Sequence, residues 1–136
     1  MATIASSKVA STVQPKGLHV GLVAVTCTYS LGASLSAGDV IQMIKVPAGA
    51  TVVDLKLSST GLTSTGSANV GDGISAARYV SAYLFSAGAT IARVNTAYVP
   101  YTYSLDDTID ITVSAVSVSA LAGAFNLTAV FSMDIA

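Results

Sequence analysis

The tripeptide Gly71-Asp72-Gly73 has the residue types of a ligand-binding loop. A dinucleotide-binding loop needs a third glycine at the start of a helix, and a P-loop needs Gly-Lys-Ser/Thr, whereas Ile-Ser-Ala follows here. A calcium loop needs several carboxylates at alternating positions, and Asp72 stands alone. Glycines flanking an aspartate are typical of a turn with positive φ angles. We therefore expect a turn between two strands that binds no cofactor and no metal.

The single histidine and the single cysteine, His19 and Cys27, are the next candidates for chemistry. A zinc site takes three or four His, Cys or carboxylate ligands, so one of each is too few. A catalytic triad needs a carboxylate that orients the histidine. We expect His19 to lie on a strand and to face solvent or an interface. Cys27 lies in an apolar run, which predicts a buried, unreactive thiol.

Asp106, Asp107 and Asp110 form the one acidic cluster of the sequence. Two carboxylates could act as a glycosidase pair or bind a hard cation. However, Asp106 and Asp107 come just before a predicted strand, where a solvated turn is the ordinary interpretation. Asp110 lies between Ile109 and Ile111, so alternation predicts that it faces outward. Because the chain has no glutamate, we predict no enzyme activity and no small-molecule substrate.

Three tyrosines, Tyr98, Tyr101 and Tyr103, fall within six residues. Tyrosine is enriched at protein interfaces and in sugar sites, because it joins a large apolar face to a polar end. The alternative is that these side chains pack on the sheet and in a loop. We predict an interface role for the cluster.

The charge content limits the partners of the chain. Only 10% of the 136 residues are charged, against a usual ~25%, and the net charge is −1. The basic residues are scattered, which argues against a nucleic-acid partner, and no polybasic or long apolar run indicates a membrane. The N-terminus lacks the apolar region of a signal peptide, so we expect synthesis in the cytoplasm. Such low charge predicts a surface partly covered by other subunits.

The hydrophobic pattern divides the chain into two parts. Residues 1–16 are small, polar and aperiodic, with isolated apolar residues at Ile4, Val9 and Val13. We interpret them as a flexible N-terminal arm that lies outside the core and orders on a partner, so these three residues are candidate interface residues. Residues 17–136 are expected to form one β-sandwich domain.

About eight runs rich in β-branched residues follow one another at intervals of roughly 8–14 residues. They span residues 18–29, 40–46, 51–57, 68–70, 78–85, 90–99, 107–118 and 125–135. This pattern predicts an all-β fold of about eight antiparallel strands, as a single sandwich or a closed barrel. The last run is the most regular, with Phe125, Leu127 and Phe131 on one face.

Three details of this pattern predict local structure. A change of phase near Leu22 indicates a bulge. The run 51–57 places Val53 with the inward-facing residues. Pro47 and Gly49 predict a tight turn, because proline presets φ and glycine accepts a positive φ.

The segments Val46 to Val53 and Val70 to Tyr79 resemble a region of tailed-phage virion proteins. In those chains a Pro-x-Gly-Ala-x-Val turn starts a strand, and a Val-Gly-Asp turn some twenty residues later precedes x-Arg-Tyr. The proteins concerned are small capsid-associated β-sandwich proteins of the decoration or cement type, usually jelly-roll and often trimeric. The resemblance covers about a third of the chain, and its shared positions are turns, so no functional residues are carried over.

The resemblance implies a capsid decoration (cement) protein that binds the outer shell and stabilises it through subunit contacts. The implied partners are the major capsid protein and further copies of the chain, with a trimer favoured, at the capsid surface of the virion. Two alternatives stay open. One is another virion component, such as a tail, neck or fibre-base protein. The other is a carbohydrate-binding β module in which the tyrosines form the platform.

Overall fold

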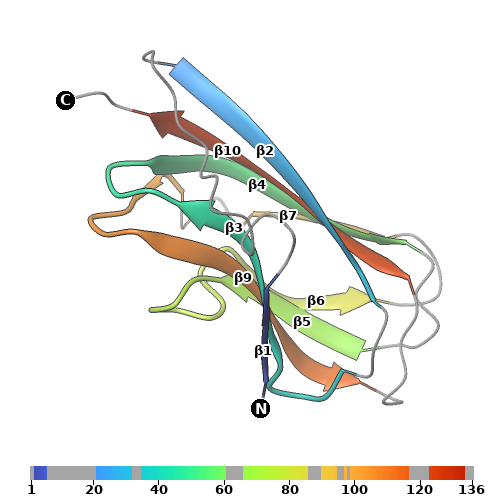
Figure 1. Cartoon of the computed structure of the whole chain (residues 1–136). Helices are drawn as coiled ribbons and strands as arrows, with labels where there is room; N and C mark the ends of the chain where they lie inside the picture. Colours follow the sequence, from blue (N-terminus) through green and yellow to red (C-terminus); the bar gives the residue numbers. More distant parts are fainter. Residues whose placement is uncertain are drawn as a thin grey trace.

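The computed structural model describes residues 2–5, 21–31, 35–60, 66–85, 90–94, 97, 99–116 and 123–133. Within these ranges the chain forms ten strands and no α-helix (Figure 1). None of the described segments is therefore a helix long and apolar enough to cross a membrane. The strands are β1 (Thr3–Ala5), β2 (Gly21–Ser30), β3 (Val40–Val46), β4 (Thr51–Thr60), β5 (Gly66–Gly71), β6 (Val80–Phe85), β7 (Thr90–Arg93), β8 (Tyr101–Thr102), β9 (Asp107–Val116) and β10 (Ala124–Met133).

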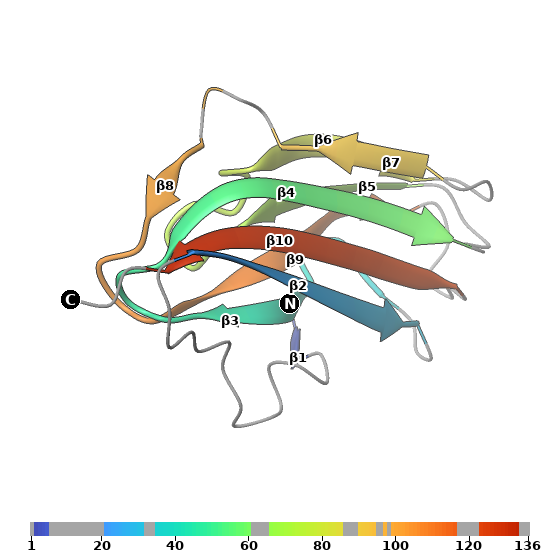
Figure 2. The ribbon, with the colours of Figure 1, turned by 90° about the horizontal axis from the view of Figure 1, so that it is seen from above.

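The strands form two layers, which confirms the predicted all-β sandwich. Sheet A has the order β1-β3-β9-β5-β6, and sheet B has the order β2-β10-β4-β7, with the short β8 paired to β4. Figure 2 shows the two sheets stacked on each other. The pairing differs from the prediction in one respect, because β1 pairs with β3 in parallel.

Eight of the strands pair in a nested order. β2 pairs with β10, β3 with β9, β4 with β7 and β5 with β6, all antiparallel. The first strand of this set thus pairs with the last, the second with the second-last, and so on to the central hairpin. Because β2 and β4 lie in sheet B while β3 and β5 lie in sheet A, the paired ribbon crosses repeatedly between the layers.

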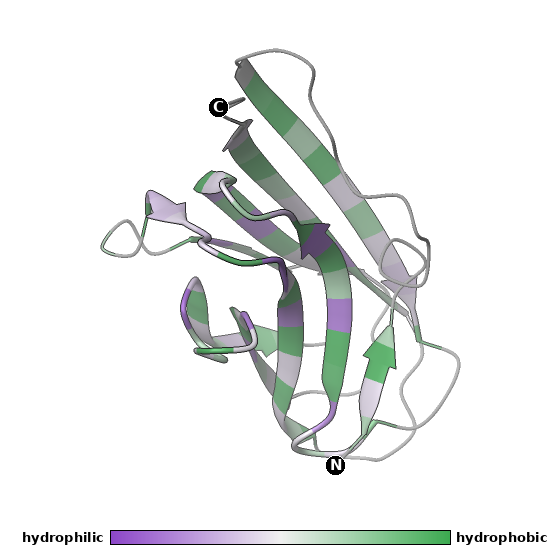
Figure 3. Ribbon diagram, turned by 60° about the vertical axis from the view of Figure 1, so that its left-hand side comes forward, coloured by the Kyte–Doolittle hydropathy of each residue, from purple (hydrophilic) through white to green (hydrophobic). Residues whose placement is uncertain are grey.

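The alternation of the last strand is confirmed. Phe125, Leu127, Ala129 and Phe131 of β10 are all fully buried between the sheets, and Figure 3 shows apolar and polar bands alternating along the strands. β10 lies between β2 and β4, so its inward face lies in the middle of sheet B. Burial of such side chains contributes about 1.5–3 kcal/mol each, which makes β10 a main source of core stability.

Two local predictions are wrong. β2 pairs with β10 along its whole length without a shift of register, so there is no bulge at Leu22, which is simply an exposed leucine. In β4 the core residue is Val52 rather than Val53. The register shift at Val130 and Phe131 leaves an extra residue in β4, and this bulge changes the phase of the strand. The turn at Pro47 and Gly49 is confirmed, with a φ of 89° at Gly49.

The structure describes only residues 2–5 of the segment that the sequence suggests is an arm. Thr3–Ala5 pairs with β3, and Ile4 is half-buried against the core. The amide of Ala2 also donates to the carboxylate of Asp39 at 3.0 Å. These residues therefore pair within their own chain, because β3 offers them a free edge. Val9 and Val13 lie outside the described residues.

Candidate functional site: the turn after β5 and the tyrosine cluster

The Gly-Asp-Gly segment is a tight turn, as predicted. The Asp72 amide donates to the carbonyl of Ser75 at 3.0 Å, which closes the turn. In return, Asp72 Oδ1 accepts from the amides of Ile74 and Ser75 at 3.0 and 2.8 Å. The side chain of an aspartate at such a position replaces the missing backbone partners of the turn.

The reason for the glycine at position 71 differs from the prediction. The described glycines with positive φ are Gly38, Gly49 and Gly123, and neither glycine of the turn belongs to them. A Cβ atom on Gly71 would instead lie 2.0 Å from the carbonyl oxygen of Ser75. Gly71 is therefore required because the turn folds back onto the strand that precedes it.

The second carboxylate oxygen of Asp72 connects the turn to the core. Asp72 Oδ2 forms an ion pair with Nε of Arg78 and accepts from the Tyr103 hydroxyl at 3.0 Å. Burial acts to raise the pKa of Asp72, but the bonds from Arg78, the turn amides and Tyr103 outweigh it and leave this pKa below its ordinary value. Both oxygens are fully used inside the protein, so the carboxylate has no free position for a ligand.

The tyrosine cluster is divided between the core and the surface. Tyr103 is buried, and its hydroxyl lies 2.6 Å from that of Tyr79. Burial, together with the neighbouring Tyr79 and Asp72, raises the pKa of Tyr103 well above its usual range, so the phenol stays neutral. Tyr101 is half-buried, packs edge-on against Tyr103 with ring centroids 5.0 Å apart, and lies under the Arg78 guanidinium at 3.8 Å.

These positions bear on the predicted interface residues. Tyr103 packs within its own chain, so its side chain is not at the surface. Tyr98 lies outside the described residues, and the interface role of Tyr101 stays a prediction. The sequence carries no signal for the contact between Tyr103 and Asp72, because the two residues are 31 positions apart. Asp72 follows β5 of sheet A, whereas Tyr103 follows β8, which pairs with β4 of sheet B.

The acidic cluster is only partly a solvated turn. Asp106 is exposed, and its Oδ1 accepts from the amide of Ala48 at 2.8 Å. Asp107 is half-buried and accepts from the amides of Thr108 at 2.8 Å and Gly73 at 3.3 Å. Asp107 thereby ties the start of β9 to the turn after β5.

The prediction that Asp110 faces solvent is wrong. Asp110 points to the opposite side from Ile109 and Ile111, as alternation requires, yet it is only 6% exposed. Its register partner on β5 is Gly71, and the backbone of Ser75 folds over that glycine. The turn after β5 therefore covers the outer face of sheet A at this point.

This burial leaves Asp110 in an unfavourable setting. Its Oδ1 atom has no hydrogen-bond partner among the described residues. Burial, and to a smaller extent the charges of Asp107 and Asp72, raise the pKa of Asp110 to about 6, against a lowering by a hydrogen bond from Thr108. Asp110 is thus a carboxyl group that becomes protonated in mild acid.

Two hollows lie on the surface of the described part of the chain. The first, of about 310 Å³, lies between the turn after β5 and the turn after β8, and it is bordered by Ile74, Tyr101, Leu105, Asp106 and Asp107. We call it the acidic groove. Its walls are tied together by the bond between Gly73 and Asp107.

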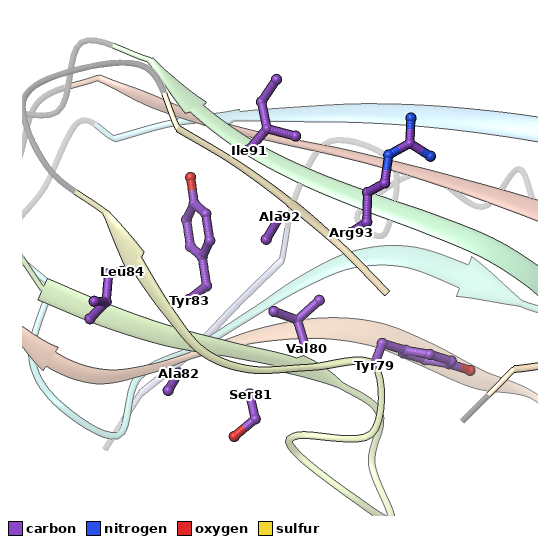
Figure 4. Close-up of a pocket in the computed structure, with 9 residues that line it drawn as sticks. All are labelled: Tyr79, Val80, Ser81, Ala82, Tyr83, Leu84, Ile91, Ala92 and Arg93. Atoms are coloured by element: carbon purple, nitrogen blue, oxygen red, sulfur yellow. The ribbon is translucent and has the colours of Figure 1, made fainter. Parts of the chain in front are cut away.

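The second hollow, of about 550 Å³, follows the edge strands β6 and β7 (Figure 4). We call it the edge groove. Figure 4 shows Tyr83 and Ala92 directed into the hollow, while Ile91 and Arg93 point outward from β7 and Leu84 points outward from β6 on the opposite side. Tyr83 extends inward from β6, and its hydroxyl lies 2.7 Å from the Ser59 hydroxyl. No pattern in the sequence predicts this hollow, because it depends on which strands lie at the edge of each sheet.

The remaining candidates for chemistry do not assemble into a site. Cys27 is buried, as expected, and His19 lies outside the described residues. Among the described residues, no three His, Cys, Asp or Glu side chains are close enough to hold a metal ion.

The architecture is that of a small all-β sandwich, and the structural comparisons agree with it. The chain is similar to a chain in the capsid of Ralstonia phage GP4, with a TM-score of 0.77 and 15% identity over 98% of this chain and 99% of the other. It is also similar to a chain of the cyanophage Pam1 capsid asymmetric unit, with a TM-score of 0.68 and 21% identity over 91% and 93%. A chain of the acidic stable capsid of Helicobacter pylori bacteriophage KHP30 gives 0.56 and 15% over 85% and 94%.

At these identities the likeness shows a shared fold, which extends over nearly the whole chain. No protein-family model matches the sequence, and no curated protein matches it significantly.

Proposed function

We propose that this protein is a structural component of a bacteriophage virion, specifically a decoration (cement) protein that binds the outer capsid shell and stabilises it. The observation that carries the proposal is the match of fold from end to end with chains of three phage capsid structures. The match covers more than nine-tenths of each of those chains, so they are small chains of about the same extent as this one.

The surface of the protein supports this role. On the outer face of sheet B, Thr26 and Thr128 are hydrogen-bonded at 3.0 Å, and Thr28 and Asn126 at 2.8 Å. These pairs make a strip of hydroxyl and amide groups along β2 and β10, beside the charged side chains of Asp54, Lys56 and Arg93 on β4 and β7. Such a strip carries little of the desolvation cost that charged groups impose on a contact between proteins. It suits a protein that binds to a shell and is itself contacted by neighbouring subunits.

The proposal includes finer features that the resemblance implies. The sandwich is taken to be a jelly roll, which the nested pairing of the eight main strands supports. The partners are the major capsid protein and further copies of the chain, with a trimer favoured, at the capsid surface. The rest of the arm, up to residue 16, takes part in attachment, with Val9 and Val13 among its contacts.

The copy number of the protein in purified particles tests the proposal. Quantitative mass spectrometry against the major capsid protein should give hundreds of copies per particle. A dozen or fewer would contradict a shell role and favour a tail, neck or fibre-base protein. Particles without any copy, together with binding of the isolated protein to a glycan array, would favour a carbohydrate-binding module instead.

A further inference from the structure

The exposed apolar side chains of the described residues are not scattered. Five large ones are exposed, and four of them border the two grooves: Ile74 (80%) and Leu105 (75%) the acidic groove, Leu84 (72%) and Ile91 (67%) the edge groove. Ile74 and Leu105 form an exposed aliphatic pair beside one hollow, which is typical of an interaction site, and Ile91 lies on the outer side of β7 beside the other hollow.

The acidic groove is held in a fixed shape. Asp72 fixes the backbone that carries Ile74, through bonds to the amides of Ile74 and Ser75. On the other wall, Asp106 anchors the turn that carries Leu105 by its bond to the Ala48 amide. Because internal bonds already order both walls, the groove loses less conformational entropy when a partner binds in it. The rim carries two carboxylates, of Asp106 and Asp107.

The edge groove has the opposite charge. Ile91 and Arg93 are two residues apart on β7 and therefore share one face of the strand. The guanidinium of Arg93 lies 3.8 Å from the carboxylate of Asp54, and both side chains are largely exposed. An exposed pair at this distance contributes little, so it leaves the Arg93 charge available to a partner. The free edges of β6 and β7 run beside these residues.

The two surfaces thus present matching chemistry: two aliphatic side chains with carboxylates at the acidic groove, and Ile91 with the Arg93 guanidinium on the outer side of β7 beside the edge groove. We propose that the edge groove of one copy docks on the acidic groove of a second copy, with Ile91 of one copy packed against Ile74 and Leu105 of the other and Arg93 facing Asp106. The inference rests on the proposed function. It adds to that function the contact by which copies associate in a shell.

The two surfaces are lined by different residues, although they adjoin within one chain, where the hydroxyl of Tyr79 in the edge groove lies 2.6 Å from that of Tyr103 in the acidic groove. A contact between two different surfaces is heterologous: each copy uses one groove towards each neighbour. Such contacts close into a ring when the rotation between copies allows it. The aliphatic side chains supply most of the affinity, and the charges determine which two surfaces pair.

The test uses the isolated full-length protein and two variants, Ile74→Asp and Ile91→Asp, in analytical ultracentrifugation over a range of concentrations. We expect the wild type to self-associate and each variant to dissociate about tenfold or more readily, which corresponds to about 1.4 kcal/mol. Leu22→Asp is the matched control, because Leu22 is equally exposed on β2 but borders neither groove. This control should associate as the wild type does.

Mixing the variants gives the sharper result. A copy with Ile74→Asp keeps an intact edge groove, and a copy with Ile91→Asp keeps an intact acidic groove, so an equimolar mixture should form dimers that neither variant forms alone. Asp106→Lys and Arg93→Glu provide a second route if an aspartate prevents folding. Each should weaken association alone, and the double variant in one chain should restore it.

A monomeric wild type, or association that Ile74→Asp and Ile91→Asp leave unchanged, would overturn the inference. A monomeric protein that is present in hundreds of copies on particles, and whose Ile74→Asp variant is lost from them, would place another shell protein in the groove. That outcome would overturn the inference and leave the proposed function standing.

Discussion

Replacing Asp110 with asparagine tests the electrostatic description of β9. Asp110 is buried, no described residue is a hydrogen-bond partner for its Oδ1, and its pKa is raised to about 6 from an ordinary value of 3.8. Because the folded protein binds this proton more tightly than the unfolded chain does, the free energy of unfolding must fall as the pH rises through the interval between the two values. At about 1.36 kcal/mol per pH unit, the full effect is about 3 kcal/mol between pH 4 and pH 7.

A second buried carboxylate, that of Asp72, acts in a different pH range. The pKa of Asp72 is lowered in the folded protein, so its contribution is present above the ordinary value and is lost as the pH falls below it. Acidification from pH 7 should therefore first stabilise the protein through Asp110 and then destabilise it through Asp72. We expect the greatest stability near pH 4 to 5.

Urea unfolding followed by far-ultraviolet circular dichroism at pH 4 to 7.5 measures this directly. Asp110→Asn should flatten the rise in stability on acidification. The slope is the diagnostic quantity, because the asparagine amide brings its own donors into a buried site and changes absolute stability. Asp106→Asn, which removes an exposed carboxylate of the same cluster, should keep the wild-type slope. A profile for Asp110→Asn parallel to that of the wild type would refute the reasoning.

Three further predictions concern the turn and the N-terminal segment. Asp72→Ala should destabilise the protein by about 3 kcal/mol in urea unfolding, because it leaves the partly buried Arg78 without its carboxylate; a loss of less than ~1 kcal/mol would contradict a structural role. Gly71→Ala should cost several times more stability than Gly73→Ala, because the new methyl group meets backbone at 2.0 Å in the first case and an aspartate side chain at 3.0 Å in the second; equal melting temperatures would show that the turn adapts. Deletion of residues 2–14 removes β1, so we expect a small decrease in melting temperature, an intact sandwich and reduced occupancy on particles; normal occupancy would place attachment elsewhere.

The sequence was sufficient for features that depend on neighbouring residues. The period of two along β10 identified the core residues Phe125, Leu127 and Phe131, and Pro47 with Gly49 identified the turn between β3 and β4. Both depend on local geometry, so no distant part of the chain can change them. The class of the fold follows from many such segments, which all agree on strands.

The errors arise where distant segments meet. Asp110 has the outward direction that alternation predicts, but a turn from more than thirty residues earlier covers it. Val53 leaves the core because a bulge opposite β10 shifts the phase of β4. The pairing of β1 with β3 depends on a free sheet edge that only the complete fold provides. None of these contacts has a signal within a window of ten or so residues.

The internal bonds also change how the candidate chemistry is interpreted. Asp72 and Arg78 are bound to each other and to Tyr103 and Tyr101 of the cluster, and Asp72 also holds the backbone at Ile74. A separate bond, from the Ala48 amide to Asp106, anchors the turn that carries Leu105. In an enzyme active site, such polar groups are oriented towards the substrate. Here they are directed inward, and the groups directed outward are aliphatic side chains and a few charges at the rims of two grooves. Such a surface can supply contact area to another protein. Because the turns are already ordered before a partner binds, binding costs little further entropy in them. The network that occupies both carboxylate oxygens of Asp72 therefore also orders one wall of the acidic groove, at which we propose that a second copy docks.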